Sequence, residues 1–467
     1  MTLRNGPQYL SLIPLSHTLL TVTALSYAER SREYYLETGT RFPRLIIWAI
    51  GLVKASAARA NAELGLLDEG LASCIYEEAL RLSQGLYDYE VTVDVFQTGS
   101  GTGLNMNVNE VIASHARKRC NREVHPNDHV NMGQSSNDVV PTAIRVAAYK
   151  AVSDLVIPAA RSMASSLRAR ASEYMELVKP GRTHLRDALP VTFGMELEAY
   201  ADALEGDATM IEQASGRLLE VPLGGTAVGT GLNAHPRFAE VVIRELSSLT
   251  GLQLRQANRM RAMRSLTDLV ALSGAIRSLA LDLYRLSQDL RLLSSGPNTG
   301  LGEVEIPTEV AGSSIMPGKK NPVTLEAAMQ AIAQVIGLDA AVSWASSLGE
   351  LELNMGIPLV GYDVQLEASL ISEALRKVET MVVRRLKANA ERMRRLAESS
   401  QALITVFSPL LGYDLATAVS EEVSRGVSLE DALRRHGVPE DKVVLVKDLL
   451  RLVKPGYPAK DLEARSA

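Results

Sequence analysis

Apolar residues recur at intervals of three and four positions over long stretches of the chain. The clearest stretch starts at Leu266 and ends at Gly296-Pro297; its apolar positions are Leu269, Ile276, Leu279, Leu283, Leu286, Leu290 and Leu293. This spacing predicts one long amphipathic helix, which the Gly-Pro pair ends. Similar patterns predict four more long helices, over residues 141–178 with a kink at Pro158, 190–219, 322–348 and 359–394.

Five helices of this length predict a mainly α-helical, elongated bundle in which each helix buries one stripe. The helix that begins at Pro322 is apolar on more than one face, so we expect other subunits to cover it. Strand signals are scarce. The predicted domains are a mixed, mainly helical N-terminal domain, a central helical bundle and a small helical C-terminal domain, over residues 1–137, 138–395 and 396–467.

Composition narrows the class of protein. A chain of 467 residues that is 46% hydrophobic and 22% charged can bury more than one core. The net charge of −5 and the lack of a basic segment interleaved with aromatic residues argue against nucleic acid as a partner. Cys74 and Cys120 alone indicate neither a disulfide framework nor a cysteine metal site, so free thiols in a reducing compartment are the simpler inference. We therefore expect a cytoplasmic protein that binds neither nucleic acid nor a membrane.

The N-terminal stretch leaves two interpretations. Residues 9–27 are rather apolar, and Leu25-Ser26-Tyr27-Ala28 weakly resembles a cleavage site of a secretory signal. Pro14 and His17 interrupt the apolar run, however. We favour a poorly ordered extension over residues 1–35.

Residues 312–322, Gly-Ser-Ser-Ile-Met-Pro-Gly-Lys-Lys-Asn-Pro, combine hydroxyls, glycines and cations in a segment that cannot be regular structure. Asn321-Pro322 is typical of an N-cap followed by a helix start, and a helix N-terminus beside Lys319 and Lys320 attracts anions. The same field favours the alkoxide of Ser313, which a hydroxyl needs to act as a base. The segment predicts an active-site loop; the alternative is a mobile surface turn.

Three further polar segments lie at predicted helix ends or in loops. The first, residues 98–102, offers hydroxyls and backbone N–H groups to a carboxylate. The second, residues 133–137, precedes a helix start and could hold an oxyanion or act as an ordinary cap. The third, residues 181–187, lies between Pro180 and Pro190 and places His184 in a loop, where a site residue is expected. Glu326, in the first turns after the active-site loop, either stabilises that helix N-terminus or orients His184.

The segment His125-Pro-Asn-Asp-His129 resembles a metal-binding sequence, because two imidazoles and a carboxylate lie within five residues. Pro126 prevents a regular helix through the first ligand, and no remote acidic cluster completes a coordination shell. We therefore expect a polar loop or an anion pocket with Arg122, and no metal ion.

These motifs, in this order, resemble class II fumarases of the fumarase and aspartase superfamily. The signature of that superfamily matches residues 312–322. The other matching segments are residues 98–102 with 105–110, 125–128, 135–138, 181–184, 223–233 and 412–414. The resemblance covers about residues 40 to 460. It implies a cofactor-free homotetramer with a core of 20 helices and active sites where three subunits meet.

The resemblance implies reversible hydration of fumarate to (S)-malate, by anti addition of water through an aci-carboxylate, within the tricarboxylic acid cycle. Ser313 matches the base that takes the C3 proton of malate, and Lys319 and Asn321 match groups that bind substrate. His184 with Glu326 matches the pair that activates water or donates a proton, and both roles stay open. The residues that match the carboxylate-binding groups are Ser100, Thr102, Ser135, Ser136, Asn137 and Thr183. Those that match a secondary anion site are Arg122, His125, Asn127 and Asp128.

Other members of the superfamily supply the alternatives. Aspartate ammonia-lyases share nearly all of these residues, but Gly225 and Gly318 resemble fumarases, where aspartases more often have alanine. Lys320 stands where fumarases usually have valine and resembles argininosuccinate lyases, and Met195 replaces a usual glutamine. A catalytically inactive structural homologue, as in lens crystallins, predicts damage to the catalytic residues, which are intact here.

Overall fold

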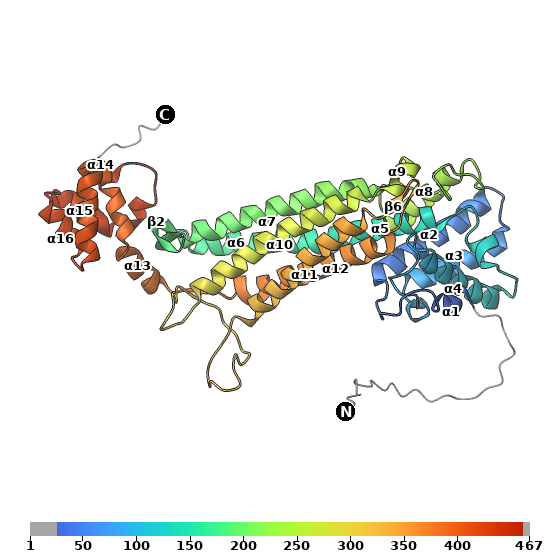
Figure 1. Cartoon of the computed structure of the whole chain (residues 1–467), viewed down its shortest axis with the longest axis horizontal. Coiled ribbons are helices and arrows are strands. Elements are labelled where there is room, and N and C mark those ends of the chain that lie inside the picture. The colour runs from blue at the N-terminus through green and yellow to red at the C-terminus, as the bar shows by residue number, and fades with distance from the viewer. Residues whose placement is uncertain (1–25, 461–467) are drawn as a thin grey trace, which may run out of the picture.

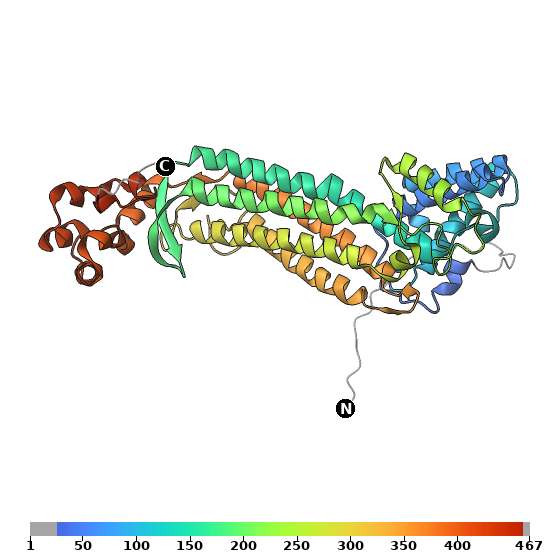
Figure 2. The ribbon, with the colours of Figure 1, turned by 90° about the horizontal axis from the view of Figure 1, so that it is seen from above.

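The computed structural model describes residues 26–460 as an elongated, mainly helical molecule, which confirms the predicted fold class. A bundle of long helices separates a helical N-terminal part from a small group of C-terminal helices (Figures 1 and 2). The long helices of the bundle are α5 (Ser136–Ala151), α6 (Ile157–Glu173), α7 (Phe193–Ser215), α10 (Thr267–Leu293), α11 (Val323–Ala345) and α12 (Ile357–Val378).

The bundle helices differ from the prediction at their ends. Helix α5 begins before Pro141, because the Ser135 hydroxyl and the Asp138 carboxylate form a capping box. The expected interruption near Pro158 is present as a π-helical turn, Val152–Val156, between α5 and α6. The helix predicted over residues 359–394 is wrong in its second half, because α12 ends at Val378 and a π-helical turn and a short strand follow.

The N-terminal part packs against the end of the bundle that lies opposite the C-terminal helices (Figure 1). Its helices are α1 (Tyr27–Ser31), α2 (Arg44–Glu63), α3 (Glu69–Ser83) and α4 (Thr102–Cys120), with α8 (Phe238–Thr250) and α9 (Arg259–Arg264) beside them. The chain is folded from Ser26 on: the backbone N–H groups of Tyr27 and Ala28 donate to the Glu110 carboxylate. Of the extension expected over residues 1–35, residues 1–25 lie outside the described residues, and the rest is ordered.

The two cysteines contradict the expectation of free thiols. Cys74 in α3 and Cys120 at the end of α4 form a disulfide across 46 positions of the sequence, with Cα atoms 6.3 Å apart. Packing of α3 against α4 brings the two side chains together, which no local sequence pattern indicates. The argument from cysteine content for a reducing compartment therefore no longer holds.

Strands are few and short, as the sequence indicates, with one exception. An antiparallel hairpin of β1 (Val178–Thr183) and β2 (Arg186–Thr192) replaces the predicted proline-bounded loop, with Pro180 opposite Pro190. Prolines are tolerated there because each strand has a free edge. The other pairs are β3 (Glu220–Val221) with β4 (Arg255–Gln256), β5 (Val304–Glu305) with β8 (Lys387–Ala388), and β6 (Gly349–Glu350) with β7 (Leu353–Asn354).

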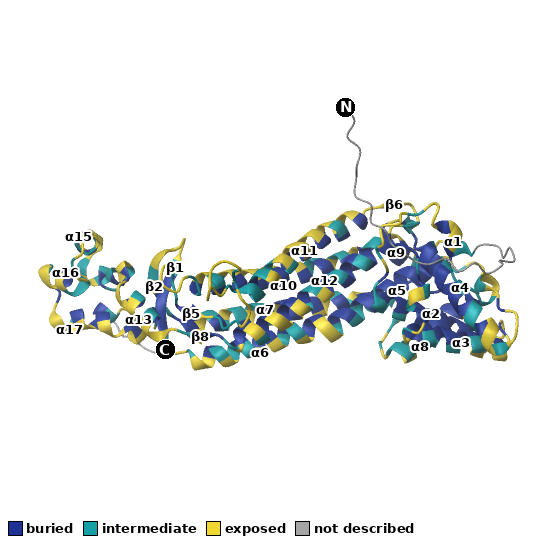
Figure 3. Cartoon of the chain, turned by 90° about the horizontal axis from the view of Figure 1, so that it is seen from below, coloured by how far each residue is buried: buried dark blue, intermediate teal, exposed yellow. Residues whose placement is uncertain are grey.

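The C-terminal helices have an apolar core of their own, which includes Leu403, Phe407, Val419 and Leu433. They are α13 (Ala390–Glu398), α14 (Ser408–Leu411), α15 (Tyr413–Ser424), α16 (Leu429–Arg435), α17 (Glu440–Val443) and α18 (Leu449–Leu452). A much larger apolar core runs through the bundle and the N-terminal part, seen as the dark interior of Figure 3.

Within residues 26–460, two helices are long and apolar enough, by composition, to resemble membrane spans. Helix α2 is a core helix, since 78% of its apolar window is buried, whereas only 39% of the corresponding window in α11 is buried. On α11, Ile336 and Trp344 are 38% and 75% exposed. Packing within one chain thus leaves an apolar face of α11 uncovered.

Candidate active site

Predicted hydroxyl groups meet where α4 and α5 begin. The Ser100 and Thr102 hydroxyl oxygens lie 2.8 Å apart, and Asn105 Nδ2, one turn into α4, donates to Ser136 Oγ at 3.4 Å. The loop needs its glycines: a Cβ on Gly99 would lie 2.4 Å from the Met355 carbonyl oxygen. Ser100, Thr102 and Ser136 are therefore brought together, as the sequence predicts, at the α2–α4 end of the bundle.

Asp138 joins this cluster to the segment over residues 223–233. One of its carboxylate oxygens accepts the N–H groups of Gly224 and Thr226, at 3.0 and 2.9 Å, and the other accepts that of Ser135 at 2.9 Å. Asn137 Nδ2 donates to the Ala227 carbonyl oxygen at 2.8 Å. Two motifs about 90 positions apart in sequence thus hold each other, which fixes the start of α5.

Burial raises the pKa of Asp138 to about 6, although three backbone N–H groups oppose the shift. These N–H groups stabilise the carboxylate form. Asp138 lies beneath the site as a structural anchor, a role that its position in the Ser-Ser-Asn-Asp motif does not reveal.

Thr183 and His184 lie at the tip of the β1–β2 hairpin, at the opposite end of the bundle beside α13 (Figure 2). His184 and Leu185 form the turn, with φ of 54° and 58°, and both are exposed. A two-residue turn with positive φ at both positions matches the twist of a hairpin. The expectation of a loop is thus corrected, and the exposed imidazole is presented at a hairpin tip, away from the hydroxyl cluster.

A buried ion pair holds the hairpin in place. Both terminal nitrogens of Arg182 donate to the two carboxylate oxygens of Glu303, at 3.0 and 2.9 Å. The Glu303 side chain is fully buried. Because such paired, planar contacts fix direction as well as distance, Arg182 and Glu303 orient the strand that ends at Thr183.

The predicted active-site loop projects from the side of the bundle before α11 (Figure 1). Ser313 Oγ accepts the backbone N–H groups of Ile315 and Met316, at 3.2 and 3.0 Å. Two donors on one hydroxyl oxygen are the environment that an alkoxide requires. Lys319 is exposed on the same loop.

Asn321 has a different role from the predicted N-cap. Its Nδ2 donates to the Gly312 carbonyl oxygen at 2.8 Å, and Pro322 occupies the N-cap position of α11 without a side-chain cap. The Gly312 N–H also donates to the Lys319 carbonyl oxygen at 2.9 Å. These two hydrogen bonds join the start of the loop to its end. Because Pro322 occupies the N-cap position of α11, the Asn321 side chain is free to bind the backbone.

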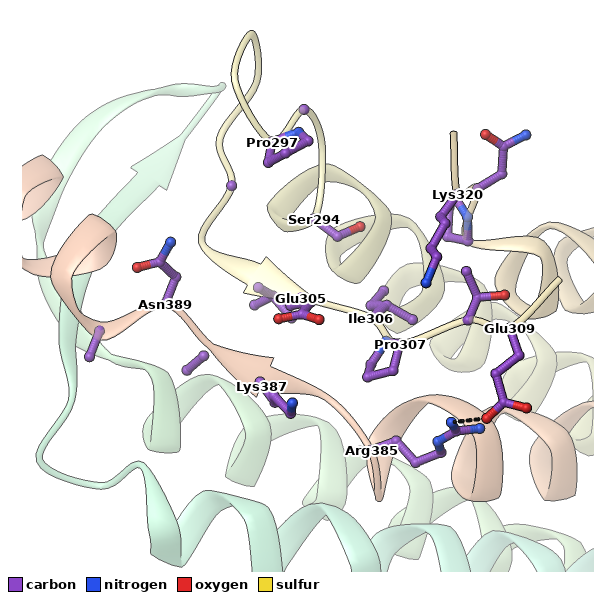
Figure 4. Close-up of a pocket in the computed structure, with 18 residues that line it drawn as sticks. Ser294, Pro297, Glu305, Ile306, Pro307, Glu309, Lys320, Arg385, Lys387 and Asn389 are labelled. Atoms are coloured by element: carbon purple, nitrogen blue, oxygen red, sulfur yellow. Dashed lines mark hydrogen bonds and ion pairs between the residues drawn. The ribbon is translucent and has the colours of Figure 1, made fainter. Parts of the chain in front are cut away.

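A cavity of about 870 Å³ opens at the root of this loop (Figure 4). Lys320 and Asn321 line it together with Lys387 and an Arg385–Glu309 ion pair at 3.1 Å. Ser313 does not line it. Within one chain, the cavity therefore lacks the hydroxyl cluster, the hairpin and the candidate base.

His184 and Glu326 share no hydrogen bond or ion pair within residues 26–460. Glu326 is half-buried in the first turn of α11, where a carboxylate favours the helix N-terminus. The single chain thus separates the predicted site residues into three groups: the hydroxyl cluster, the hairpin tip and the loop with Glu326.

The residues of the predicted anion site lie on the surface around a short π-helical turn, Pro126–Val130. His125 Nδ1 accepts the Asp128 backbone N–H at 3.1 Å, and Arg122 forms an ion pair with Asp68. Asn127 is exposed. Among the described residues, no group of three or more histidine, cysteine, aspartate or glutamate side chains could hold a metal ion.

The long helices form a bundle, and the polar motifs lie at its two ends and on one loop. A sequence model of a family described as lyase matches residues 26–337, which makes this bundle protein a helical lyase. The chain is 54% identical to the fumarate hydratase class II of Saccharolobus solfataricus, over 93% of this chain and all of that protein. It is 42% identical to that of Xylella fastidiosa, over 84% of this chain and 83% of that protein.

Solved structures agree with these relatives. A fumarate lyase/delta crystallin from Brucella melitensis, bound to cobalt, matches with a TM-score of 0.87 and 37% identity, over 92% of this chain and 95% of that one. The class II fumarase of Schistosoma mansoni matches with a TM-score of 0.87 and 32% identity, over 95% and 97%. The chain belongs to the class II fumarate hydratase family.

Proposed function

We propose that this protein is a fumarate hydratase, which interconverts fumarate and (S)-malate by anti addition and elimination of water in the tricarboxylic acid cycle. The observation that carries the proposal is 54% identity to a class II fumarate hydratase along that protein's whole length. The motifs from which the substrate-binding and catalytic residues were predicted support it.

In the dehydration direction, Ser313 takes the C3 proton of (S)-malate and leaves the electron pair on the carbon and its carboxylate. The N–H groups of Ile315 and Met316 support the serine alkoxide, since both already point at its oxygen. Lys319 and Asn321 bind the substrate, and the lysine charge stabilises the aci-carboxylate.

The C2–O bond then breaks, and the leaving hydroxide takes a proton and departs as water. We assign this proton to the His184–Glu326 pair, which in the reverse direction activates the attacking water. Ser100, Thr102, Ser135, Ser136, Asn137 and Thr183 bind the substrate carboxylates. The N-terminus of α5, at Ser135, adds the positive end of its helix dipole to that site.

The active protein is proposed to be a homotetramer in which three subunits complete each site. Two features support this assembly: one chain keeps the three residue groups apart, and α11 has an uncovered apolar face with Trp344 exposed by 75%. Arg122, His125, Asn127 and Asp128 form the proposed secondary anion site at the surface. The proposed location is the cytoplasm.

The test of the reaction is to follow fumarate absorbance after adding enzyme to (S)-malate, (S)-aspartate and argininosuccinate in parallel. We expect fumarate from malate alone. Fumarate from aspartate would establish an ammonia-lyase, which shares most of this site. No product from any of the three would support a structural homologue.

Subunit mixing tests the shared site. Ser313→Ala and His184→Ala proteins are each expected to be inactive, but co-refolding them should restore part of the activity. Mixed tetramers contain some sites in which the loop comes from a His184→Ala chain and the hairpin from a Ser313→Ala chain. If mixing restores nothing while the tetramer re-forms, each site is built from a single chain.

A further inference from the structure

Lys54 is a charged residue inside the core. It is the single charged residue in the sequence Ile-Ile-Trp-Ala-Ile-Gly-Leu-Val-Lys-Ala-Ser-Ala-Ala over residues 46–58, and it is 0% exposed within α2. Its Nζ donates to Asn131 Oδ1 at 2.8 Å and to Gln134 Oε1 at 3.0 Å. Burial of an ammonium group costs free energy unless the group is paired and hydrogen-bonded, so the position of Lys54 requires an explanation.

The contacts of Lys54 lead to the hydroxyl cluster. Asn131 Oδ1, which Lys54 binds, also accepts from Asn105 Nδ2 at 3.1 Å. The same Asn105 nitrogen donates to Ser136 Oγ at 3.4 Å. Two residues, Asn131 and Asn105, thus connect the buried cation to a hydroxyl that the proposed function assigns to substrate binding.

The direction of these hydrogen bonds follows from Lys54, because an ammonium group can only donate. The amide oxygen of Asn131 must face it, so the Asn131 nitrogen points away and donates to the Gln134 carbonyl oxygen at 3.2 Å. Asn105 in turn presents its nitrogen to Asn131 and Ser136. Because Ser136 Oγ accepts from Asn105, its own hydrogen is available to donate to a carboxylate.

No carboxylate neutralises Lys54 by direct contact among the described residues. Asp138 acts on it electrostatically, but both Asp138 oxygens are occupied by backbone N–H groups of Ser135, Gly224 and Thr226. Burial lowers the pKa of Lys54 to about 7, and Asp138 opposes the shift. A dianion bound in front of Ser136 would stabilise the ammonium form further.

We propose that Lys54 is a positioning residue for substrate binding. It fixes Asn131 and Gln134, orients the Ser136 hydroxyl through Asn105, and places a buried positive charge behind the carboxylate site. The inference rests on the proposed function in one respect, the assignment of Ser136 to a substrate carboxylate.

The test is Lys54→Met in the full chain, which keeps the length of the side chain and removes its charge and donors. We expect the KM for (S)-malate and for fumarate to rise by about tenfold or more while kcat changes little, since the contact acts equally on bound substrate and transition state. The double variant Lys54→Met, Ser136→Ala should have a KM close to that of Ser136→Ala alone, because both changes disable the same contact.

Ile50→Ala is the matched control. Ile50 lies one turn before Lys54 on α2, is 0% exposed and has no part in the polar network, so the change lowers the melting temperature without raising KM. Asn105→Ala is the second variant if Lys54→Met does not fold. It removes the link to Ser136 while leaving Lys54 in place, and it should raise KM similarly.

Equal KM values for Lys54→Met and Ile50→Ala, or fully multiplicative effects of Lys54→Met and Ser136→Ala, would overturn the proposal. Calorimetric binding of succinate, an unreactive dicarboxylate, separates this result from failure of the proposed function. If the wild type binds succinate and Lys54→Met binds it about tenfold more weakly, the positioning role stands even for a different reaction. Unchanged succinate binding would overturn it.

Discussion

At the scale of single residues, the Ser313 hydroxyl oxygen already receives two backbone N–H groups in the single chain. Ser313→Ala removes the base but not the loop, since Gly312 and Asn321 close the loop through other atoms. We expect turnover of malate to fall by several orders of magnitude with the oligomer unchanged. Initial rates and the mass of the assembled protein check this; an unchanged rate would remove Ser313 from the mechanism.

The two neighbouring lysines of the loop offer a matched pair of substitutions. Lys319→Ala should raise KM and lower kcat, because a fixed cation on a carboxylate makes a charge-assisted contact that is worth roughly 1.5–3 kcal/mol. Lys320→Val, a change to the residue usual in fumarases, should leave both constants nearly unaltered. Steady-state kinetics on malate compare them. Equal effects of the two changes would mean that the loop supplies only diffuse positive charge.

At the scale of structural elements, the hairpin that carries His184 depends on the pair of Arg182 and Glu303. Arg182→Met leaves the Glu303 carboxylate buried without its partner, which should lower the free energy of unfolding by about 3–5 kcal/mol. Arg182→Met combined with Glu303→Met should recover part of the loss, since no charge remains. Urea unfolding measures both. A double variant less stable than the single one would show that the hairpin needs the charges themselves.

A second element-scale feature is the acidic group between α10, α11 and α12. Ser273 Oγ lies within hydrogen-bond distance of two carboxyl oxygens, Asp339 Oδ1 at 2.9 Å and Glu367 Oε1 at 2.7 Å. Burial raises the pKa of Glu367 to about 8 and that of Asp363 to about 7. Glu367 also feels the charges of Asp339 and Asp363, which raise its pKa further. Both raised carboxyls are therefore protonated in the folded protein under mildly acidic conditions.

These raised pKa values predict that stability falls as the pH rises. Between about pH 4 and pH 8 the unfolded chain has lost the Glu367 proton while the folded chain keeps it, so unfolding releases a proton. Below this window both states are protonated and the penalty is absent. Glu367→Gln should flatten the decline, measured as melting temperature from pH 5 to pH 8. An equally steep decline in the variant would exclude Glu367 as its source.

At the scale of the whole molecule, the Cys74–Cys120 disulfide closes a loop of 46 positions in the N-terminal part. In the chain-entropy account, a loop of this length is worth about 4 kcal/mol. A Cys74→Ser, Cys120→Ser protein should therefore melt at a lower temperature, with malate turnover retained at room temperature. Thiol titration of denatured, unreduced protein provides the control: two free thiols would mean that the bond does not form.

The sequence predicted some whole-molecule features well and others poorly. Helix α10 was correct nearly to the residue, because its apolar stripe is buried in the expected register from Leu269 to Leu293. The hairpin was missed because Pro180 and Pro190 are poor strand residues, which are tolerated here because each strand of a two-stranded hairpin has a free edge. The role of Lys54 was missed too, although a single cation in an apolar helix is a visible signal.

The sequence by itself determined which reactive groups the protein has and that its helices are long. Local motifs contain the hydroxyls, the lysine and the imidazole, and periodic apolar residues predict long helices. Only the tertiary structure decided what those groups contact. Contacts between distant segments, such as Asp138 with residues 224–226, Arg182 with Glu303 and Cys74 with Cys120, depend on how helices pack, and packing leaves no local pattern in the chain. The same packing separates Ser136, His184 and Ser313 within one chain, because a long rigid bundle holds its two ends apart.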